Sequence, residues 1–313
     1  MKKIIIFVLI FTYILNILCS KYTTRATEIV NAITKQTNLK WKARHNRFSS
    51  MNETDFKKFL TMNKKISNVN YPQPTYTTVP PNQYNMITNL TTKSCIHPIR
   101  DQGACGGCWS FALTGVLSDR FCLKSKGATN KVFSPQFLLS CDKTNLGCRG
   151  GFIDKSWQFV KNYGVVTESC LPFSLNTFNT GKPEKCPSTC VDTRVALTKS
   201  LYKISSFGQI KGVTNIMNEI YNNGPVEATL QIYEDFMFYS NGIYSHNTGK
   251  LLGNHAIKIV GYGTSTVNNV QTSYWICANS WGITWGNAGY FWIEKGKNES
   301  GIEDQVFMGI PKL

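Results

Sequence analysis

Eleven cysteines in 313 residues constrain this chain more than any other feature of its sequence. That many cysteines are unusual in a reducing compartment and typical of exported proteins whose folds are held by disulfides. Cys19 belongs to an apolar leader, so ten cysteines remain in the body of the protein: Cys95, Cys105, Cys108, Cys122, Cys141, Cys148, Cys170, Cys186, Cys190 and Cys277. The pattern predicts a disulfide-linked protein of the secretory pathway.

The first twenty residues support export. Lys2 and Lys3 precede an apolar run over residues 4–18, which is short for a membrane span and typical of a signal peptide. We predict a signal peptide over 1–20, with an uncleaved anchor as the alternative, and no membrane span after its removal. Asn52, Asn89 and Asn298 lie in glycosylation sequons, so they are possible glycan acceptors on this route.

The formal charge of +16 invites a nucleic-acid or membrane interpretation, but its distribution argues against one. Residues 1–78 hold 13 of the 34 Lys and Arg residues and only 3 of the 18 Asp and Glu residues. The excess is therefore concentrated at the front of the chain, and the remainder is mildly basic. Hydrophobic residues make up 42% of the sequence, which is enough for a packed core. We expect no nucleic-acid partner.

The front of the chain has the organisation of a propeptide. Ile29, Ala32 and Ile33 recur at helical spacing within a basic stretch, which predicts a small helical segment. Residues 71–83 contain four prolines and predict an extended, exposed linker that is easily cut. We assign residues 21–78 to a propeptide and 79–313 to the body.

The body is predicted to be α+β. A helix should begin at Cys108, present one apolar face and end near Gly127. From about Ser200, short apolar runs separated by glycines predict strands of a mostly antiparallel sheet. The body should therefore consist of one helical half and one sheet half.

Three strings carry the candidate chemistry: DQGACGGCWSFA (101–112), GNHAIKIVGYG (253–263) and ANSWGITWGNAGY (278–290). A cysteine followed far downstream by His and Asn is the arrangement of a thiol-nucleophile hydrolase, which points to Cys108, His255 and Asn279. Other interpretations remain open at this point. The CxxC spacing of Cys105 and Cys108 could mark zinc or redox chemistry, Cys108 could be a disulfide partner, and His255 could be an ordinary core histidine.

These strings resemble the papain family of cysteine peptidases, except that the family usually has Ser or Ala at the position of Gly107. The resemblance implies a papain-like fold with a helical left half, an antiparallel β-barrel-like right half and the active-site cleft between them. It also implies a Cys108 thiolate paired with a His255 imidazolium, which Asn279 orients and Trp281 shields from water. Gln102 resembles the oxyanion-hole donor.

Further strings resemble cathepsin B in particular, namely 28–48, 117–122, 222–250 and 300–311. In the string 146–157, Gly150 and Gly151 resemble the glycines that face bound substrate, where a side chain would collide. The region that corresponds to the occluding loop, 170–190, is short and has no histidine. Gln305 stands where the family member has an acidic residue at the base of the S2 pocket, so we expect weaker acceptance of Arg at P2.

The resemblance also implies the disulfide pairing. It predicts the pairs Cys95–Cys122, Cys105–Cys148, Cys141–Cys186 and Cys170–Cys190, each worth about 2–4 kcal/mol. Cys108 then remains as the nucleophile, and Cys277 lies in an apolar string where we expect a buried, unreactive thiol.

The combined prediction is a cysteine endopeptidase made as a zymogen, with little or no dipeptide-releasing activity. It needs no cofactor and no metal, acts on peptides and proteins, is inhibited by its own propeptide and by cystatin-type proteins, and works as a monomer. A lysosome, a digestive vacuole or the extracellular space would be its destination. The alternatives are a catalytically silent relative and a disulfide-linked binding module.

Overall fold

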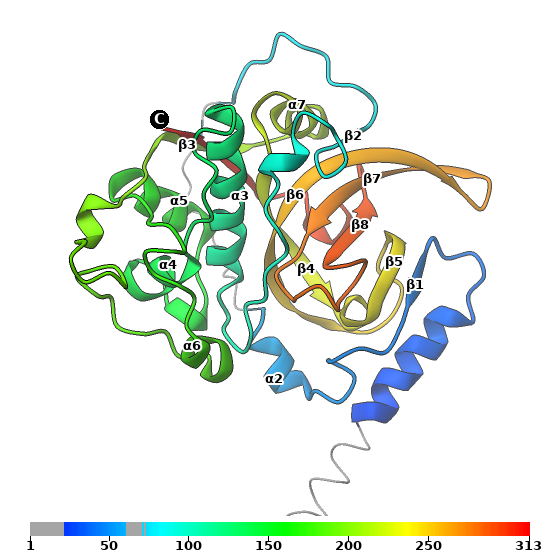
Figure 1. The fold of residues 1–313 in the computed structure, drawn as a ribbon. Coiled ribbons are helices and arrows are strands. Elements are labelled where there is room, and N and C mark those ends of the chain that lie inside the picture. The colour runs from blue at the N-terminus through cyan, green and yellow to red at the C-terminus, as the bar shows by residue number, and fades with distance from the viewer. Residues whose placement is uncertain (1–21, 61–70, 72) are drawn as a thin grey trace, which may run out of the picture.

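The computed structural model describes residues 22–60, 71 and 73–313. Helices gather on one side and a large sheet on the other, with one long helix between them (Figure 1). The helical side holds α3 (Cys108–Lys124), α4 (Pro135–Cys141), α5 (Ile153–Asn162) and α6 (Leu175–Thr180), and the short turns η1 (Lys93–Cys95), η2 (Gly147–Arg149) and η3 (Leu197–Lys199). The α+β prediction is confirmed.

The central helix α3 differs from its prediction in one respect. The sequence suggested a single apolar face, yet every residue from Cys108 to Cys122 is buried except Gly115. The reason is position, because α3 contacts α4 and α5 on the helical side and β6, β9 and α7 on the sheet side. Even its charged residues Asp119 and Arg120 are almost fully buried. A helix in this position has no solvent face, so its sequence lacks the usual amphipathic pattern.

The sheet is mostly antiparallel, with strand order β1-β5-β8-β7-β6-β4-β9-β3, and β2 pairs with β6 beside this path. Only β5 and β8 run parallel. Its strands are β1 (Trp41–Ala43), β2 (Tyr84–Asn85), β3 (Ile204–Ile210), β4 (Val226–Tyr233), β5 (Tyr239–Tyr244), β6 (Leu251–Val267), β7 (Val270–Ala278), β8 (Tyr290–Glu294) and β9 (Val306–Pro311). The helix α7 (Val213–Asn223) and the turns η4 (Glu234–Phe238) and η5 (Glu299–Gly301) complete this half.

The barrel-like half expected from the resemblance is a curved open sheet and not a closed barrel. Its two end strands, β1 and β3, pair with one neighbour each and not with one another. Closure would require these two edges to meet, but β3 packs against α5 and β1 belongs to the front of the chain.

Residues 22–60, here called the front segment, pack against the sheet half. The segment is helical over 22–34, adds β1 to the edge of β5 and ends after α2 (Glu53–Lys57). Its apolar side chains belong to the same buried cluster as the sheet residues; they include Ala26, Ile29, Ile33, Trp41, Phe48, Phe56, Phe59 and Leu60. The predicted helical segment is therefore partly a strand, and part of the predicted propeptide, 61–70, lies outside the described residues. In Figure 1, α2 lies at the lower end of α3.

Four disulfides link the body, and they are the four pairs that the resemblance implied: Cys95–Cys122, Cys105–Cys148, Cys141–Cys186 and Cys170–Cys190. Cys108 and Cys277 are free and buried. Burial in apolar surroundings raises the pKa of the Cys277 thiol well above its ordinary value, so this thiol is unreactive. Of the helices that the structure describes, none could cross a membrane.

A buried ion pair joins α3 to α7. Arg120 donates to Glu219 at 2.5 Å and to the carbonyls of Gly224, Pro225 and Gly309. Burial by itself would raise the pKa of Glu219, but the charge of Arg120 and a hydrogen bond from Tyr76 hold it below its ordinary value. One guanidinium thus ties α3 to α7, to the start of β4 and to β9.

We expect Arg120→Met to lower the free energy of unfolding by about 3–5 kcal/mol, because Glu219 would be left buried without its counter-charge. Urea unfolding of the full chain in a Cys108→Ala background measures this. Arg194→Met is the matched control, since Arg194 is 87% exposed and pairs with Asp192 on the surface. It should change stability by less than about 0.5 kcal/mol. Equal losses in the two variants would contradict the structural role of the buried pair.

Candidate active site

The thiol of Cys108 lies at the first residue of α3, where helix geometry favours a negative charge. Gly107 precedes it and supplies no capping side chain, so the free backbone N–H groups of the first turn are left to the thiol and its surroundings. Cys108 is fully buried and free, which excludes the disulfide interpretation. Its CxxC neighbour Cys105 is bonded to Cys148, so a zinc or redox pair is excluded as well.

His255 and Asn279 are brought together by the pairing of β6 with β7. His255 lies near the start of β6, and Asn279 directly follows the last residue of β7. Asn279 Oδ1 lies 2.7 Å from His255 Nε2 and accepts the backbone N–H of Ser280 at 2.8 Å. Because Oδ1 can only accept, the ring must carry its proton on Nε2. Neutral His255 therefore carries no proton on Nδ1.

The thiol and the ring belong to one site. Cys108 Sγ interacts with the backbone N–H of Ala256, the residue that follows His255. His255 is fully buried, and its Nδ1 has no well-formed hydrogen bond to any described residue. The sheet half therefore delivers the imidazole to the helix end that carries the sulfur. The interpretation of His255 as an ordinary core histidine does not fit this placement.

Aromatic rings enclose the far side of the imidazole. The ring centroids of His255 and Trp281 are 4.7 Å apart, and Trp281 is fully buried. Phe48 and Phe56 of the front segment contact the same indole edge-on, with centroids at 5.3 and 5.5 Å. Trp281 thus lies against the ring that bonds to Asn279, and it also packs against the front segment.

Gln102 is fixed next to the thiol by contacts from both halves of the molecule. Its backbone N–H donates to the Ser280 carbonyl at 2.9 Å, and its Oε1 accepts the Ser280 hydroxyl at 2.6 Å. Its Nε2 donates to the Cys105 carbonyl at 2.8 Å and to the Phe59 carbonyl at 3.2 Å. The amide of Gln102 is therefore already aimed at a peptide carbonyl, supplied here by the front segment.

Burial controls the protonation of the pair. It raises the pKa of the Cys108 thiol to about 12, against hydrogen bonds from the backbone of Ala256 and Trp109. It lowers the pKa of His255 to about 4, against the hydrogen bond with Asn279 and the influence of the Phe59 backbone. Both groups are therefore neutral near pH 7 while the front segment is in place. The resemblance implied a thiolate–imidazolium pair. We expect that pair only after the front segment has left the site.

The structure requires glycine at positions 150 and 151 for two different reasons. Gly150 adopts φ +112°, which side chains rarely tolerate. At Gly151 a Cβ would lie 2.8 Å from the ring of Trp109 and 2.9 Å from Asn145 Oδ1. Packing against the indole next to the nucleophile already demands glycine there, without any substrate.

Gln305 lies beside the strands that carry His255, although it is outside the three sequence strings 101–112, 253–263 and 278–290. It is 5% exposed and directly precedes β9, and its carbonyl accepts the N–H of Thr229. Thr229 pairs with Ala256, the neighbour of His255. Gln305 is thus two strands away from the imidazole.

The loop 170–190 packs on the stretch that carries Gln102. The Phe178 carbonyl accepts the N–H of Ala104 at 2.7 Å, and a Cβ at Gly103 would lie 2.4 Å from the same oxygen. Cys141–Cys186 and Cys170–Cys190 hold the loop, and α6 forms its centre. The loop therefore borders the site without bringing a histidine to it.

Two residues of the site's surroundings were missed in the sequence. Glu227 on β4 is fully buried, burial raises its pKa well above its ordinary value, and a negative charge there would disfavour the thiolate of Cys108. His97 Nδ1 lies 2.9 Å from the buried carboxylate of Asp119. Neither position carries a sequence motif, since burial and contacts alone distinguish them. No cluster of potential metal ligands occurs among the described residues.

A free thiol at a helix N-terminus, with an amide-oriented imidazole beside it, defines the site of a thiol-dependent hydrolase. Comparison with known proteins agrees with this class. The family model described as "Papain family cysteine protease" matches residues 81–310. The chain belongs to the papain family of cysteine proteases.

Within this family the chain is similar to cathepsin B-like members. It is 38% identical over 248 residues to the gut-specific cysteine proteinase of Caenorhabditis elegans, covering 74% of each chain. It is 36% identical over 306 residues to cathepsin B-like cysteine proteinase 3 of the same organism, covering 87% of this chain and 79% of the relative. The solved structure of proCathepsin B S9 from Trypanosoma congolense superposes with a TM-score of 0.82 at 31% identity, over 91% of this chain and 98% of that one.

Gly107 stands where the family usually has Ser or Ala, and its surroundings explain this departure. A Cβ there would lie 3.0 Å from Leu139 Cδ2 and 3.1 Å from Cys105 Sγ, so Leu139 occupies the space of a side chain. We expect Gly107→Ser to cost about 1–2 kcal/mol by overpacking. In a double-mutant cycle with Leu139→Ala, urea unfolding should show that the two losses are less than additive by about 1 kcal/mol. Additive losses would mean that Leu139 does not determine the residue at 107.

Proposed function

We propose that this protein is a cysteine endopeptidase made as a zymogen, with Cys108 as nucleophile, His255 as acid and base, Asn279 as the orienting residue and Gln102 as an oxyanion donor. One observation carries the proposal most directly. The Phe59 carbonyl accepts a hydrogen bond from Gln102 Nε2 at 3.2 Å, as a substrate carbonyl would, and the Phe59 backbone is close enough to the His255 ring to influence its pKa. A site that accepts a peptide carbonyl at these groups is suited to peptide hydrolysis.

The reaction follows from the placement of the groups. Once the site is uncovered, water and the first turn of α3 favour the Cys108 thiolate, and the proton moves to Nδ1 of His255. The sulfur attacks the peptide carbonyl carbon, while Gln102 Nε2 and the Cys108 N–H donate to the developing oxyanion. His255 then protonates the leaving amine, and a thioester remains. A water molecule, deprotonated by His255, hydrolyses the thioester and restores the thiol.

The domain assignment is part of the proposal: signal peptide 1–20, propeptide 21–78 and peptidase domain 79–313. The front segment supports it by covering Trp281, Gln102 and His255 at once. Ion pairs hold this cover to the body, among them Arg25–Glu234 at 2.7 Å and Lys250–Glu53 at 2.6 Å. The family match begins only after the proposed propeptide, at residue 81. In this proposal the protein's own propeptide is its first inhibitor.

We further propose that cleavage is internal to the substrate and that release of C-terminal dipeptides is weak. The loop 170–190 offers no imidazole to bind a terminal carboxylate. Gln305 adds no negative charge near the sheet of the site, which favours apolar side chains over Arg at P2. Gly150, Gly151 and Trp281 would contact the substrate.

Export is the setting that suits the four disulfides, with a lysosome, a digestive vacuole or the extracellular space as destination. Cystatin-type inhibitors are expected partners because they would occupy the cleft in place of the front segment. A monomer is sufficient for this chemistry, since one chain supplies every group named above.

The decisive experiment digests a library of blocked and free peptides with the processed protein and identifies the products by mass spectrometry. Internal cleavage, with apolar P2 side chains preferred and activity lost in Cys108→Ala, is the expected result. Sequential release of dipeptides from free C-termini would refute the endopeptidase assignment. An intact library, together with no labelling of Cys108 by a thiol-directed epoxide, would favour the catalytically silent relative.

Gln102→Ala should lower kcat by about 10²–10³, because one donor to the oxyanion is lost. KM should change little, since the oxyanion forms only in the transition state. Steady-state kinetics on a fluorogenic peptide measure both. Gln158→Ala serves as a control amide, because Gln158 is an exposed residue of the body, and it should leave kcat unchanged. An unchanged kcat in Gln102→Ala would remove Gln102 from the mechanism.

The cover should also suppress thiol reactivity. With a pKa of about 12, roughly one Cys108 in 10⁵ is a thiolate at pH 7, and this fraction rises tenfold per pH unit. Alkylation of the full chain by iodoacetamide should therefore be slow at pH 6 and rise steeply with pH. The processed protein should react quickly with little pH dependence near neutrality, because its thiolate is paired with an imidazolium.

Phe56→Ala should accelerate alkylation of the full chain at pH 6 by at least about tenfold, because it removes a fully buried ring that packs on Trp281. Leu175→Ala is the control, since Leu175 is 78% exposed. Mass spectrometry of the Cys108 peptide gives the rate. Equal rates in the full chain and the processed protein would show that the front segment does not control the thiol.

A further inference from the structure

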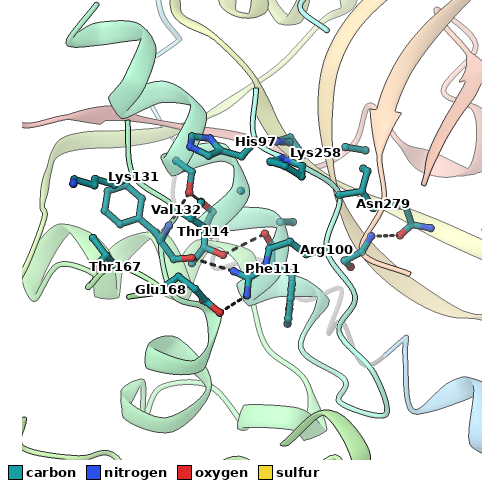
Figure 2. Close-up of a pocket in the computed structure, with 18 of the residues that line it drawn as sticks. His97, Arg100, Phe111, Thr114, Lys131, Val132, Thr167, Glu168, Lys258 and Asn279 are labelled. Atoms are coloured by element: carbon teal, nitrogen blue, oxygen red, sulfur yellow. Dashed lines mark hydrogen bonds and ion pairs between the residues drawn. The ribbon is translucent and has the colours of Figure 1, made fainter. Parts of the chain in front are cut away.

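A second cavity of about 610 Å³ lies between the helical half and the sheet half, beside the middle of α3. Its walls come from α3, the stretches 97–100 and 130–133, the stretch 167–172 and the paired strands β6 and β7. In Figure 2, Phe111, Lys131 and Glu168 lie on the helical side, and Lys258 and Asn279 lie on the sheet side. The volume is within the usual range of small-molecule sites.

Gly115 opens this cavity. It is the one residue between Cys108 and Cys122 in α3 that is not buried, although the helix is otherwise enclosed. A Cβ at Gly115 would meet only the side chain of Lys258, at 3.8 Å, so there is room for a side chain. Glycine in the middle of a helix costs about 0.5–1 kcal/mol relative to alanine, and no close contact demands it here. Helix stability therefore does not explain why residue 115 is a glycine.

The walls combine apolar surface with positive charge. Phe111, Ala112, Ile99, Val132, Phe133 and Ile257 supply apolar surface. Arg100, Lys131 and Lys258 supply positive charge, against the single carboxylate of Glu168 among the lining residues. Such walls favour a ligand with an apolar body and a negative group.

The cations differ in their availability. Arg100 pairs with Glu168 at 2.6 Å and lies over the ring of Phe111, and Lys258 pairs with Asp119 at 2.5 Å. Lys131 is exposed and makes no ion pair with any residue of the described part of the chain. Glu168 keeps one oxygen without a partner there, as an acceptor for a ligand N–H or O–H. A ligand could therefore pair with Lys131 without breaking an existing ion pair.

The cavity adjoins the candidate active site, but most of the groups proposed for catalysis do not line it. Of the residues proposed for catalysis, only Asn279 lines it, and Cys108, His255 and Gln102 do not. Ala256, next to His255, also belongs to the wall. None of the described front-segment residues lines it, so the cavity is open in the covered form as well.

We propose that this cavity is a binding site for a small amphipathic anion, a molecule with an aromatic or aliphatic body and one carboxylate or sulfonate. The apolar body lies against Phe111 and Gly115, and the negative group faces Lys131. The site goes beyond the peptidase function and does not depend on it, because none of the thiol chemistry takes part.

Binding of 1-anilinonaphthalene-8-sulfonate to the full chain with Cys108→Ala tests the site, with fluorescence titration as the readout. The probe should bind at one site. Gly115→Leu should weaken binding by at least about tenfold by filling the cavity, whereas Gly115→Ala should stay within about twofold. Both substitutions raise helix propensity, so the difference between them isolates side-chain volume. Thermal unfolding of each variant confirms that the chain is folded.

Charge is tested separately. Lys131→Met should weaken binding of the sulfonate by about three- to tenfold, and Lys182→Met, on the loop away from the cavity, should not. The uncharged analogue N-phenyl-1-naphthylamine should bind more weakly than the sulfonate and should not respond to Lys131→Met. No saturable binding, equal binding by a folded Gly115→Leu variant, or equal affinity for charged and uncharged probes would each overturn the proposal. If Gly115→Leu does not fold, the comparison of Lys131→Met with Lys182→Met tests the proposal.

Discussion

The enclosure of α3 between the two halves is the constraint on which the rest of the structure depends. A helix with no solvent face must satisfy its charged residues internally, and Arg120 does so by bonding to Glu219 and to the carbonyls of Gly224, Pro225 and Gly309. Because α3 is fixed along its whole length, Cys108 at its first residue has a fixed position. The imidazole arrives from β6, which contacts the same helix. The reactive pair is thus formed where the two halves meet, and neither half contains it alone.

The front segment uses the same physical chemistry to keep the pair inactive. It adds a strand to the sheet, buries aromatic rings on Trp281 and places one carbonyl on Gln102. Excluding water from a thiol and an imidazole makes both ionised forms costly, so the pair stays neutral. In the proposed function, removal of the cover restores access and also changes the preferred protonation state. One segment therefore controls both substrate binding and nucleophilicity.

The effect of a missing side chain in this chain depends on its neighbours. At Gly107 the missing side chain is replaced by Leu139, so the space is filled. At Gly115 nothing replaces it, and a cavity results. The loop 170–190 keeps two disulfides and packs on Ala104 but has no histidine. Similar local changes thus have different consequences, which depend on the neighbours that the fold supplies.

The sequence alone determined the α+β class, the mostly antiparallel sheet, the helix that begins at Cys108 and the family, because these depend on residue types at short spacings and on motifs such as 101–112. It could not reveal that α3 is buried all round, that the sheet stays open, or that part of the front segment forms a strand, because these depend on neighbours far along the chain. Tertiary structure alone decided the neutral state of Cys108 and His255, the contact of His97 with Asp119, the burial of Glu227, and the cavity beside Gly115. Burial and through-space charge set these properties, and residues distant in sequence supply both.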